Sequence, residues 1–352
     1  MGDDPAGHRR TRRMSPDAWQ AAGIALILAC ALTPVMRRYS HARGLIDQPG
    51  ARRSHASPVA RGGGLAIGIS LVATAVAFAP NGALVAPLVG GAAVVSLLGW
   101  VDDHAPLSVG WRLGIQLLAA VGIVAWLGPV ESISIGDREV SAGWLWTPMA
   151  VVAIIWLINL FNFMDGSDGL ASSQAAISFA LFAAAFGLAG DATGAWLAAV
   201  AAGASLGFLL WNRPTASIFL GDSGSLLLGW CAGGLALAGT LADSFSVWVS
   251  FIIVSPFVTD ATLTLCWRLI RGERWYTPHA DHAYQYLIRL GWGHGRVLLA
   301  WIALNGLLVV PATAVALWKP QADLGVAAVL TVILAGAWYL VHFVVAKERV
   351  TT

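Results

Sequence analysis

The stretch TPMAVVAIIWLINLFNFMDGSDGLAS, residues 147–172, decides the fold class of this chain. Its first half is an apolar run without a charged residue, and such a run can cross the hydrocarbon layer of a membrane as a helix of roughly 20 residues. Asp165 and Asp168 follow directly, among glycines that favour tight turns. Carboxylates at membrane depth are costly and usually functional, so this stretch predicts both a membrane fold and a site.

Similar apolar runs recur along the whole chain. Of its 352 residues, 57% are hydrophobic and only 11% are charged, whereas soluble domains carry about 25% charged residues. We predict an all-α polytopic membrane protein with about eleven transmembrane helices. The spans are expected near 16–36, 62–80, 84–101, 111–128, 145–161, 170–188, 193–211, 223–241, 245–270, 296–318 and 323–346.

These spans are expected to form a single domain. We place a transmembrane catalytic domain at 16–346, a mobile polar tail at 1–15 and a short cytoplasmic tail at 347–352. The three cysteines lie in apolar runs without metal-ligand spacing, so they indicate neither a disulfide framework nor a redox function.

The distribution of basic residues predicts the orientation. Most Arg and Lys residues fall in or beside the loops at 37–61, 102–110, 212–222 and 271–295, which an odd number of spans places on one side. The positive-inside rule puts that side in the cytoplasm. The arginines between residues 9 and 13 would then lie outside, so either this tail is tolerated there or one span is miscounted.

Acidic residues gather at the same side. Asp102 and Asp103 stand in GWVDDH, Asp222 stands in FLGDSGS, and Asp260 lies within the ninth span, nearer its cytoplasmic end. Together with Asp165 and Asp168 they could bind a hard cation through oxygen ligands, and Mg²⁺ is the natural choice when phosphates complete the shell. Alternatively, the pairs are helix caps or turns, and Asp260 forms a structural pair with Arg268.

Two loops supply basic and imidazole groups. RGLIDQPGARRSHASPVARGGG contains Arg53 and His55 and leads through glycines into a helix, an arrangement that suits phosphate binding. His279 and His282 lie in the loop 271–295, where no cysteine or third histidine at close spacing supports zinc. Imidazoles that contact a diphosphate fit this loop better.

The ordered set LIDQPGARRSHASPVARGGGLAI, GWVDDH, NLFNFMDGSDGLA, FLLWNRPTASIFLGDSGSLLLG and PFVTDATLTLCWRLIRGE resembles the polyprenyl-phosphate N-acetylhexosamine-1-phosphate transferases. The likeness runs from about residue 43 to 290. It implies a multi-pass protein of the bacterial inner membrane, an eleven-helix or similar bundle around an active-site cleft that faces the cytoplasm. It also implies Mg²⁺-dependent transfer of an N-acetylhexosamine-1-phosphate from a UDP-sugar to undecaprenyl phosphate, with release of UMP.

The same resemblance assigns roles to individual residues. It implies catalytic roles for Asp102, Asp103, Asp165 and Asp168. It implies a metal site at Asp222 and Asp102, for Mg²⁺ or Mn²⁺ as its substitute. It implies substrate binding by Asn159, Asn162 and Asn212, to which the two loops described above add Arg53, His55, His279 and His282. The expected partners are the bilayer, undecaprenyl phosphate and the UDP-N-acetylhexosamine, with no nucleic acid and with a homodimer left open.

One motif departs from the common family pattern. The family often carries His-x-His-His in its last large cytoplasmic loop, whereas this chain reads PHADHAYQ at 278–285. This variant resembles the branch that starts O-antigen and lipopolysaccharide synthesis on N-acetylfucosamine or N-acetylquinovosamine. The sugar stays open, N-acetylglucosamine included.

Two other classes use buried aspartates. A cation-coupled transporter would place its carboxylates near mid-membrane on broken helices. An alcohol phosphatidyltransferase would carry DG-x₂-AR and further spaced aspartates, which DGSDGLASS lacks.

Overall fold

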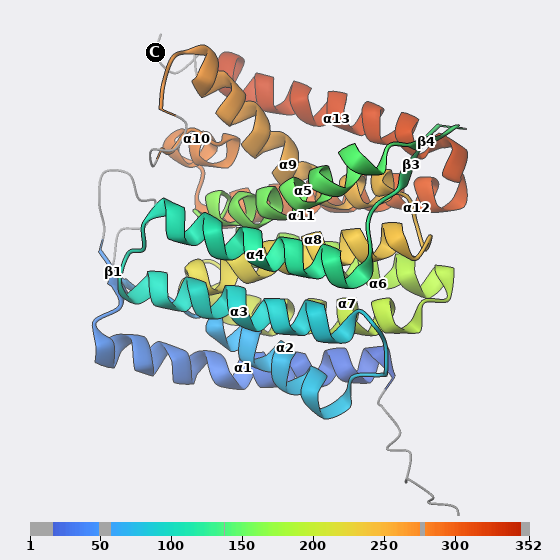
Figure 1. Ribbon diagram of the computed structural model, residues 1–352. Coiled ribbons are helices and arrows are strands. Elements are labelled where there is room, and N and C mark those ends of the chain that lie inside the picture. The colour runs from blue at the N-terminus through green and yellow to red at the C-terminus, as the bar shows by residue number, and fades with distance from the viewer. Residues whose placement is uncertain (1–16, 49–57, 137, 275–278, 346–352) are drawn as a thin grey trace, which may run out of the picture.

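The structure, a computed structural model, describes residues 17–48, 58–136, 138–274 and 279–345. It is a bundle of helices whose axes run roughly side by side (Figure 1). Within the described residues, ten helical segments are long and apolar enough to cross a membrane. The predicted all-α polytopic membrane fold is therefore confirmed. Arg53, His55 and the tails 1–15 and 347–352 lie outside the described residues.

Each predicted span contains a helix of the structure. The helices are α1 (Ala18–Arg43), α2 (Leu65–Phe78), α3 (Val85–His104), α4 (Val109–Leu127), α5 (Gly143–Phe163), α6 (Leu170–Ala189), α7 (Ala192–Asn212), α8 (Asp222–Leu241), α9 (Val247–Ile270), α10 (Ala283–Arg289), α11 (His294–Leu304), α12 (Val310–Trp318) and α13 (Asp323–Tyr339). Short helical turns join or extend some of them, namely η1 (Asn305–Val309), η2 (Pro320–Ala322) and η3 (Leu340–Val345).

Helix α2 differs from the other spans in length. It has 14 residues, which at 1.5 Å per residue make it about 21 Å long. It is apolar but falls below the length that a full membrane crossing requires. The predicted span at 62–80 is thus a helix, but a short one.

Helix α8 is the centre of the bundle, since 83% of the residues in an 18-residue apolar stretch of this helix are buried. It packs against α3 and α5, and glycines permit the close approach. A Cβ on Gly91 of α3 would lie 1.9 Å from the ring of Trp230, and one on Gly229 would lie 2.4 Å from the carbonyl oxygen of Leu157 on α5. Small residues serve this purpose in lipid, where helices associate by packing rather than by the hydrophobic effect.

Two small antiparallel β-ladders lie at opposite ends of the bundle (Figure 1). At one end, β1 (Ile46–Asp47) pairs with β2 (Val59–Ala60), with Ile46 opposite Ala60. At the other, β3 (Ser132–Ile135) pairs with β4 (Arg138–Ser141) in a hairpin between α4 and α5. The sequence predicted no strands at either place.

The connections that carry the predicted site residues share the end of the bundle marked by β1. The α3–α4, α5–α6 and α7–α8 connections and the segment around α10 all lie there (Figure 1). The structure therefore confirms that these loops are on one side, as the span count predicted.

Candidate active site

The site forms where the end of α3 meets the start of α8. Gly99 of α3 packs on the first residue of α8, since an added Cβ would lie 2.3 Å from the carbonyl carbon of Asp222. Gly64, at the start of α2, packs on Gly224. A Cβ added to Gly64 would lie 2.2 Å from the Cα of Gly224. The three helix ends are thus held close by backbone contact, and the aspartates of α3 and α8 meet.

Asp103 holds the first turn of α8. Its Oδ1 accepts a hydrogen bond from the backbone N–H of Asp222 at 3.0 Å, and its Oδ2 accepts one from Ser223 at 3.1 Å. Arg61 pairs with the same carboxylate at 2.9 Å. An acceptor at a helix N-terminus satisfies amides that lack a partner within the helix. Asp103 is therefore a positioning residue in this structure, and its catalytic function stays a prediction.

Asp102 faces Asp222 across a shared arginine. Arg112, on α4, lies 2.9 Å from Oδ2 of Asp102 and 3.6 Å from Oδ2 of Asp222. Arg112 therefore bridges the two carboxylates. The backbone N–H of Leu107 donates to Oδ1 of Asp102 at 2.6 Å. The pair predicted to hold a metal is thus brought together.

Asn162, at the end of α5, orients Asp222. Its Nδ2 donates to Oδ1 of Asp222 and to Oγ of Ser225, both at 2.9 Å. Its Oδ1 accepts from Arg112 at 3.4 Å. Asn159 lies about one helical turn deeper and donates to Gln116 at 2.7 Å. Asn162 is therefore part of the carboxylate cluster, while Asn159 supports it from below.

Asp165 completes the cluster from the turn after α5. Burial raises its pKa well above the usual range of an aspartate, and the carboxylates of Asp222 and Asp103 raise it further. A carboxyl in such surroundings is stable as an anion only when a cation compensates it. Its position thus fits a site built for positive charge.

Asp168 and Asn212 brace the neighbouring turn instead of pointing at the cluster. Asp168 accepts from the backbone N–H of Ala216 at 3.0 Å and lies 3.7 Å from Nδ1 of His294. Asn212, which is 3% exposed, accepts from the backbone N–H of Gly169 at 3.1 Å and donates to the carbonyl of Ile218 at 3.0 Å. Both side chains tie the glycine-rich turn to the α7–α8 connection.

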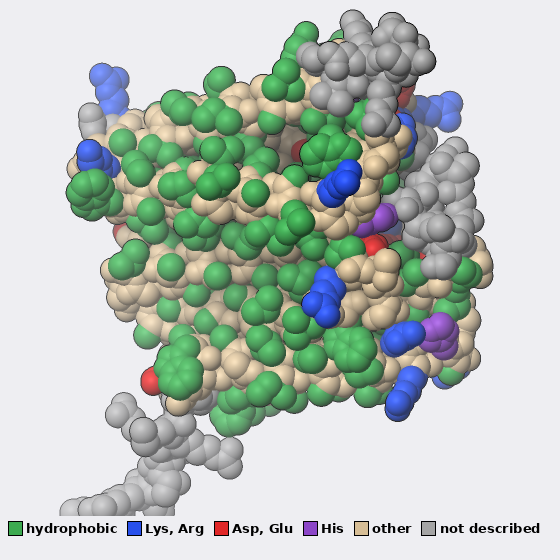
Figure 2. All heavy atoms as spheres, turned by 180° about the vertical axis from the view of Figure 1, so that it is seen from behind, with side chains coloured by type: hydrophobic (Ala, Val, Ile, Leu, Met, Phe, Trp, Pro, Cys, Tyr) green, Lys and Arg blue, Asp and Glu red, His purple; other side chains and the backbone are tan. Residues whose placement is uncertain are grey.

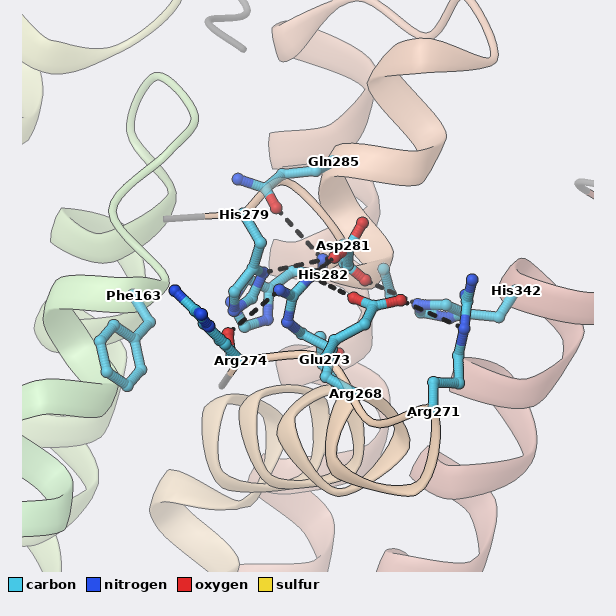
Figure 3. A network of polar contacts seen from close by, with 12 residues as sticks. Phe163, Arg268, Arg271, Glu273, Arg274, His279, Asp281, His282, Gln285 and His342 are labelled. Carbon is cyan, nitrogen blue, oxygen red and sulfur yellow. Dashed lines mark hydrogen bonds and ion pairs between the residues drawn. The ribbon is translucent and has the colours of Figure 1, made fainter. Parts of the chain in front are cut away.

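The predicted histidines lie in a second cluster around α10 (Figure 3). Arg268 pairs with Asp281 and, at 2.9 Å, with Glu273. Nδ1 of His279 lies 3.8 Å from Oδ2 of Asp281. Burial, His282 and Arg268 lower the pKa of His279 to about 4, so this imidazole is neutral near pH 7 and would meet a phosphate as a neutral group.

Asp260 has a different partner from the one the sequence suggested. Both of its carboxylate oxygens accept from the backbone N–H of Ala283, at 3.1 and 3.2 Å, and Oδ1 accepts from Thr264 at 3.1 Å. Nδ1 of His282 lies 3.5 Å away. The structural alternative of an Asp260–Arg268 pair is therefore wrong. Asp260 is not part of the Asp102–Asp222 cluster either, and it fixes the start of α10.

Tyr284 connects the two clusters. It is 1% exposed, its ring stacks on His282 with an interplanar angle of 7°, and its hydroxyl donates to the carbonyl of Phe163 at 3.4 Å. A Cβ on Gly166 would lie 2.2 Å from that hydroxyl. The α10 segment is thus docked directly on the DGSDG turn.

Arg112 and Tyr284 are not among the site residues that the sequence predicted. Arg112 stands near the start of an apolar run, in GWRLGIQLL, where an arginine is usual at a membrane interface. Gln116, four residues later, is the signal that could have found it, because i and i+4 share a helix face. Tyr284 belongs to the motif variant PHADHAYQ, in which the sequence predicted no site role for it.

The cluster suits a divalent cation by charge and by ligand type. When ionised, Asp102, Asp103, Asp165 and Asp222 carry four negative charges against two positive charges on Arg61 and Arg112, an excess of two. Among the described residues, no group of three or more His, Cys, Asp or Glu could hold a metal by itself. Mg²⁺ is usually bound by one or two carboxylates, with waters and substrate phosphates as its other ligands, so the residues fit that ion.

This chain is similar in sequence to known proteins. The model of glycosyl transferase family 4 matches residues 85–240. The probable undecaprenyl-phosphate N-acetylglucosaminyl 1-phosphate transferase of Bacillus subtilis strain 168 is 30% identical over 276 residues, 77% of either chain. The decaprenyl-phosphate N-acetylglucosaminephosphotransferase of Mycobacterium tuberculosis strain H37Rv is 28% identical over 90% of this chain and 87% of its own.

A further relative is named for a different transferred group. The phospho-N-acetylmuramoyl-pentapeptide-transferase of Symbiobacterium thermophilum is 29% identical over 84% of this chain and 97% of its own. These enzymes share transfer of a sugar phosphate to a polyprenyl phosphate. The chain therefore belongs to glycosyl transferase family 4, within the superfamily of polyprenyl-phosphate N-acetylhexosamine-1-phosphate transferases.

Proposed function

We propose that this protein transfers an N-acetylhexosamine-1-phosphate from a UDP-sugar to undecaprenyl phosphate, with release of UMP, and so starts a lipid-linked cell-surface polysaccharide. The observation that supports this most is the Asp102–Asp222 pair with Arg112 between its carboxylates, at one end of a membrane bundle. A lipid phosphate and a soluble nucleotide can meet only at such an end.

The reaction needs little acid–base chemistry. A lipid phosphate has a second pKa near 6, so much of it is a dianion at neutral pH. Its oxygen attacks the phosphorus that carries the sugar, a new phosphoanhydride bond forms there, and the bond to the uridylyl phosphate breaks so that UMP leaves. Positioning and charge compensation dominate in such a transfer.

A divalent cation would be held by Asp102 and Asp222, and when bound it compensates charge on the diphosphate. We infer Mg²⁺, with Mn²⁺ as a substitute. The chain's own groups do the rest. Arg112 lies beside both carboxylates, where it can bind a phosphate oxygen once a cation takes its place between them. Asn162 keeps Asp222 in its orientation.

The position of the active site follows from the same chemistry. UDP-sugars are cytoplasmic, so we place the carboxylate end of the bundle in the cytoplasm, in a bacterial inner membrane. Of the described basic residues, only Arg138 and Lys319 are at the opposite end. The positive-inside rule favours this orientation.

The sugar is proposed from the α10 segment. Its HAYQ motif consists of residues 282–285, and Gln285 closes the turn by accepting from the backbone N–H of His282 at 3.1 Å. We infer a deoxy-N-acetylhexosamine such as N-acetylfucosamine or N-acetylquinovosamine, as in O-antigen initiation, with N-acetylglucosamine as the second candidate because two relatives are named for it.

The test is exchange of labelled UMP into a panel of UDP-N-acetylhexosamines by protein in detergent, with undecaprenyl phosphate and Mg²⁺. We expect label in one UDP-sugar, only when lipid phosphate and cation are both present, and none with Asp222→Asn. Asp191→Asn is the matched control, because Asp191 also stands at a helix start, where it accepts from Gly194 at 2.8 Å. Folded protein without exchange for any sugar would contradict the proposal and favour a cation-coupled transporter.

A further inference from the structure

Helix α11 lies along the DGSDG turn and the first turns of α6. His294, Leu298 and Trp301 are spaced so that they share one face of α11, and this face makes the contact. Nδ1 of His294 binds within the turn itself. Leu298 packs on Gly169, since a Cβ added to Gly169 would lie 3.0 Å from its Cδ2. The indole N–H of Trp301 donates to Oε1 of Gln174 at 2.8 Å. The turn is thus held from α11 as well as from α10.

The contact of His294 lies at the active end of the bundle. The face of the molecule between its two ends is largely hydrophobic, whereas histidine side chains reach the surface toward the active end, near acidic and basic side chains (Figure 2). The side chain of His294 is 18% exposed, while Leu298 and Trp301 are buried. His294 therefore belongs to the polar end of the molecule and not to the apolar packing of α11.

The backbone amide of Asp168 determines which nitrogen of His294 carries the hydrogen. This amide donates to Nδ1 at 3.2 Å. A backbone N–H can only donate, so Nδ1 must offer its lone pair, and the hydrogen of the neutral ring is on Nε2. The hydroxyl of Ser167 lies 2.9 Å from the same Nδ1 and can donate to it as well. The Asp168 carboxylate, which would favour a protonated ring, is farther away, with Oδ1 at 3.7 Å. The contacts therefore select the neutral ring.

Two successive amides of the turn donate to side chains of other helices. The N–H of Gly169 donates to Asn212 of α7 at 3.1 Å, and the N–H of Asp168 donates to His294 of α11. Amides at the start of a helix, here α6, have no acceptor within that helix, and a buried amide that loses its acceptor is destabilised. Asp168 is buried. Loss of the imidazole acceptor would therefore loosen the turn that also carries Asp165.

We propose that His294 is a positioning residue of the active site, which holds the DGSDG turn by accepting the amide of Asp168 at Nδ1 while Nε2 carries the hydrogen. It acts through the turn, whose Asp165 is influenced electrostatically by Asp222. A displacement of about 1 Å in an active site can slow a reaction on the order of 100-fold. This inference rests on the proposed function, because that function supplies the reaction for which the turn is positioned.

Three substitutions of His294 distinguish its two ring nitrogens. Oδ1 of asparagine stands the same number of bonds from Cα as Nδ1 of histidine, so His294→Asn keeps an acceptor for the amide of Asp168. The side-chain amide of glutamine reaches the position of Nε2 instead, so His294→Gln removes that acceptor. His294→Leu removes both polar atoms.

The readout is steady-state transfer to undecaprenyl phosphate. We expect His294→Asn to retain most of the wild-type kcat, and we expect His294→Gln and His294→Leu to lose at least tenfold in kcat. The KM for undecaprenyl phosphate should stay close to wild type in all three variants, because the turn and not the lipid contact is changed. His41→Leu is the control, because His41 is exposed on α1 and its loss should leave both parameters unchanged.

Several outcomes would overturn the proposal. Equal kcat for His294→Asn and His294→Gln would do so, whether both variants are active or both are inactive. A higher kcat for His294→Gln would do so because the ring would then act through Nε2. A lower melting temperature without a loss of kcat would show a structural role only. A wild-type protein without turnover would instead contradict the proposed function, so the two failures are distinguishable.

A second test does not depend on turnover. In protein labelled with ¹⁵N-histidine, the two nitrogens of a neutral imidazole give separate signals, and only one nitrogen carries a proton. The His294 signals, identified by their loss in His294→Asn, should show an unprotonated Nδ1 and a protonated Nε2 at neutral pH. His104 is the internal control, because its Nδ1 lies 2.8 Å from the carbonyl oxygen of Trp100, which can only accept, so its Nδ1 should carry the proton. A protonated Nδ1 on His294 would overturn the proposal.

Discussion

The carboxylate of Asp103 accepts the backbone N–H of Asp222 at 3.0 Å, although 119 residues separate them. One aspartate thus fixes the start of the helix whose first residue is the other. The two residues look alike as acidic motifs in the sequence, but only one of them has both carboxylate oxygens taken up by backbone amides.

Different variants of these two aspartates should separate positioning from chemistry. Asp103→Asn removes one acceptor from the start of α8 and the ion pair with Arg61, and hydrogen bonds to charged groups contribute about 1.5–3 kcal/mol each. We expect Asp103→Asn to lower both activity and the melting temperature in detergent. Asp222→Asn should abolish UMP exchange while its melting temperature falls less. Equal melting temperatures for the two variants would contradict the assignment.

Replacement of Arg112 should strengthen cation binding and slow the transfer reaction. Arg112→Gln removes one positive charge from the cluster, so the Mg²⁺ concentration for half-maximal activity should fall. The maximal rate should fall at least a hundredfold, because a guanidinium beside the diphosphate is lost. A Mg²⁺ titration of UMP exchange measures both. Arg112→Lys keeps the charge and should leave the Mg²⁺ dependence near wild type; a shift as large as that of Arg112→Gln would refute the charge argument.

Gly166 and Tyr284 should behave as a coupled pair. A Cβ at residue 166 would lie 2.2 Å from the hydroxyl of Tyr284 but 3.2 Å from its Cζ, and the buried ring cannot swing away. Gly166→Ala should therefore reduce activity at least tenfold, and Tyr284→Phe in that background should restore most of it. The readout is a double-mutant cycle on kcat/KM. Additive losses in the double variant would show that the clash is not the cause.

His279 should make folding stability depend on pH. Its pKa is about 4 in the folded protein, below the usual value near 6.5, so the unfolded chain binds a proton first as pH falls. This group therefore lowers stability as pH falls from about 6.5 to about 4, and it has no such effect above that window. Between pH 7 and pH 5, the melting temperature of His279→Gln should fall less than that of the wild-type protein. His41→Gln, an exposed histidine on α1, is the control, and an equal pH slope in His279→Gln and wild type would contradict the prediction.

The sequence predicted the helices and the side of the bundle on which each loop lies. The length of an apolar run and the position of basic residues are set by the membrane around the chain, and they do not depend on contacts between distant segments. It also predicted that six aspartates at this end converge; Asp102, Asp103, Asp165 and Asp222 do, whereas Asp168 and Asp260 have partners elsewhere. These arguments need only the position of a residue along its own helix.

Pairings between distant segments were beyond such arguments. Asp260 lies eight residues before Arg268 on the same helix, and proximity in the sequence suggested a pair. The fold of the segment after α9 instead brings the backbone N–H of Ala283 to Asp260 and Asp281 to Arg268. Asn212 stays a predicted substrate-binding residue, although in the structure its side chain accepts from Gly169 and Ser172 and donates to Ile218. The β3–β4 hairpin was missed because four-residue strands carry little periodicity.

The shortness of α2 has a consequence for the surrounding bilayer. A helix of about 21 Å beside a hydrocarbon layer of about 30 Å leaves roughly 9 Å of mismatch, which a membrane relieves by thinning locally. Because α2 begins against Gly224 in the first turn of α8, the thinned region adjoins the carboxylate cluster. The water boundary would then dip toward the reacting phosphates, so that a lipid anchored in the leaflet reaches the cluster without being lifted from it, and membrane thickness itself becomes a determinant of turnover.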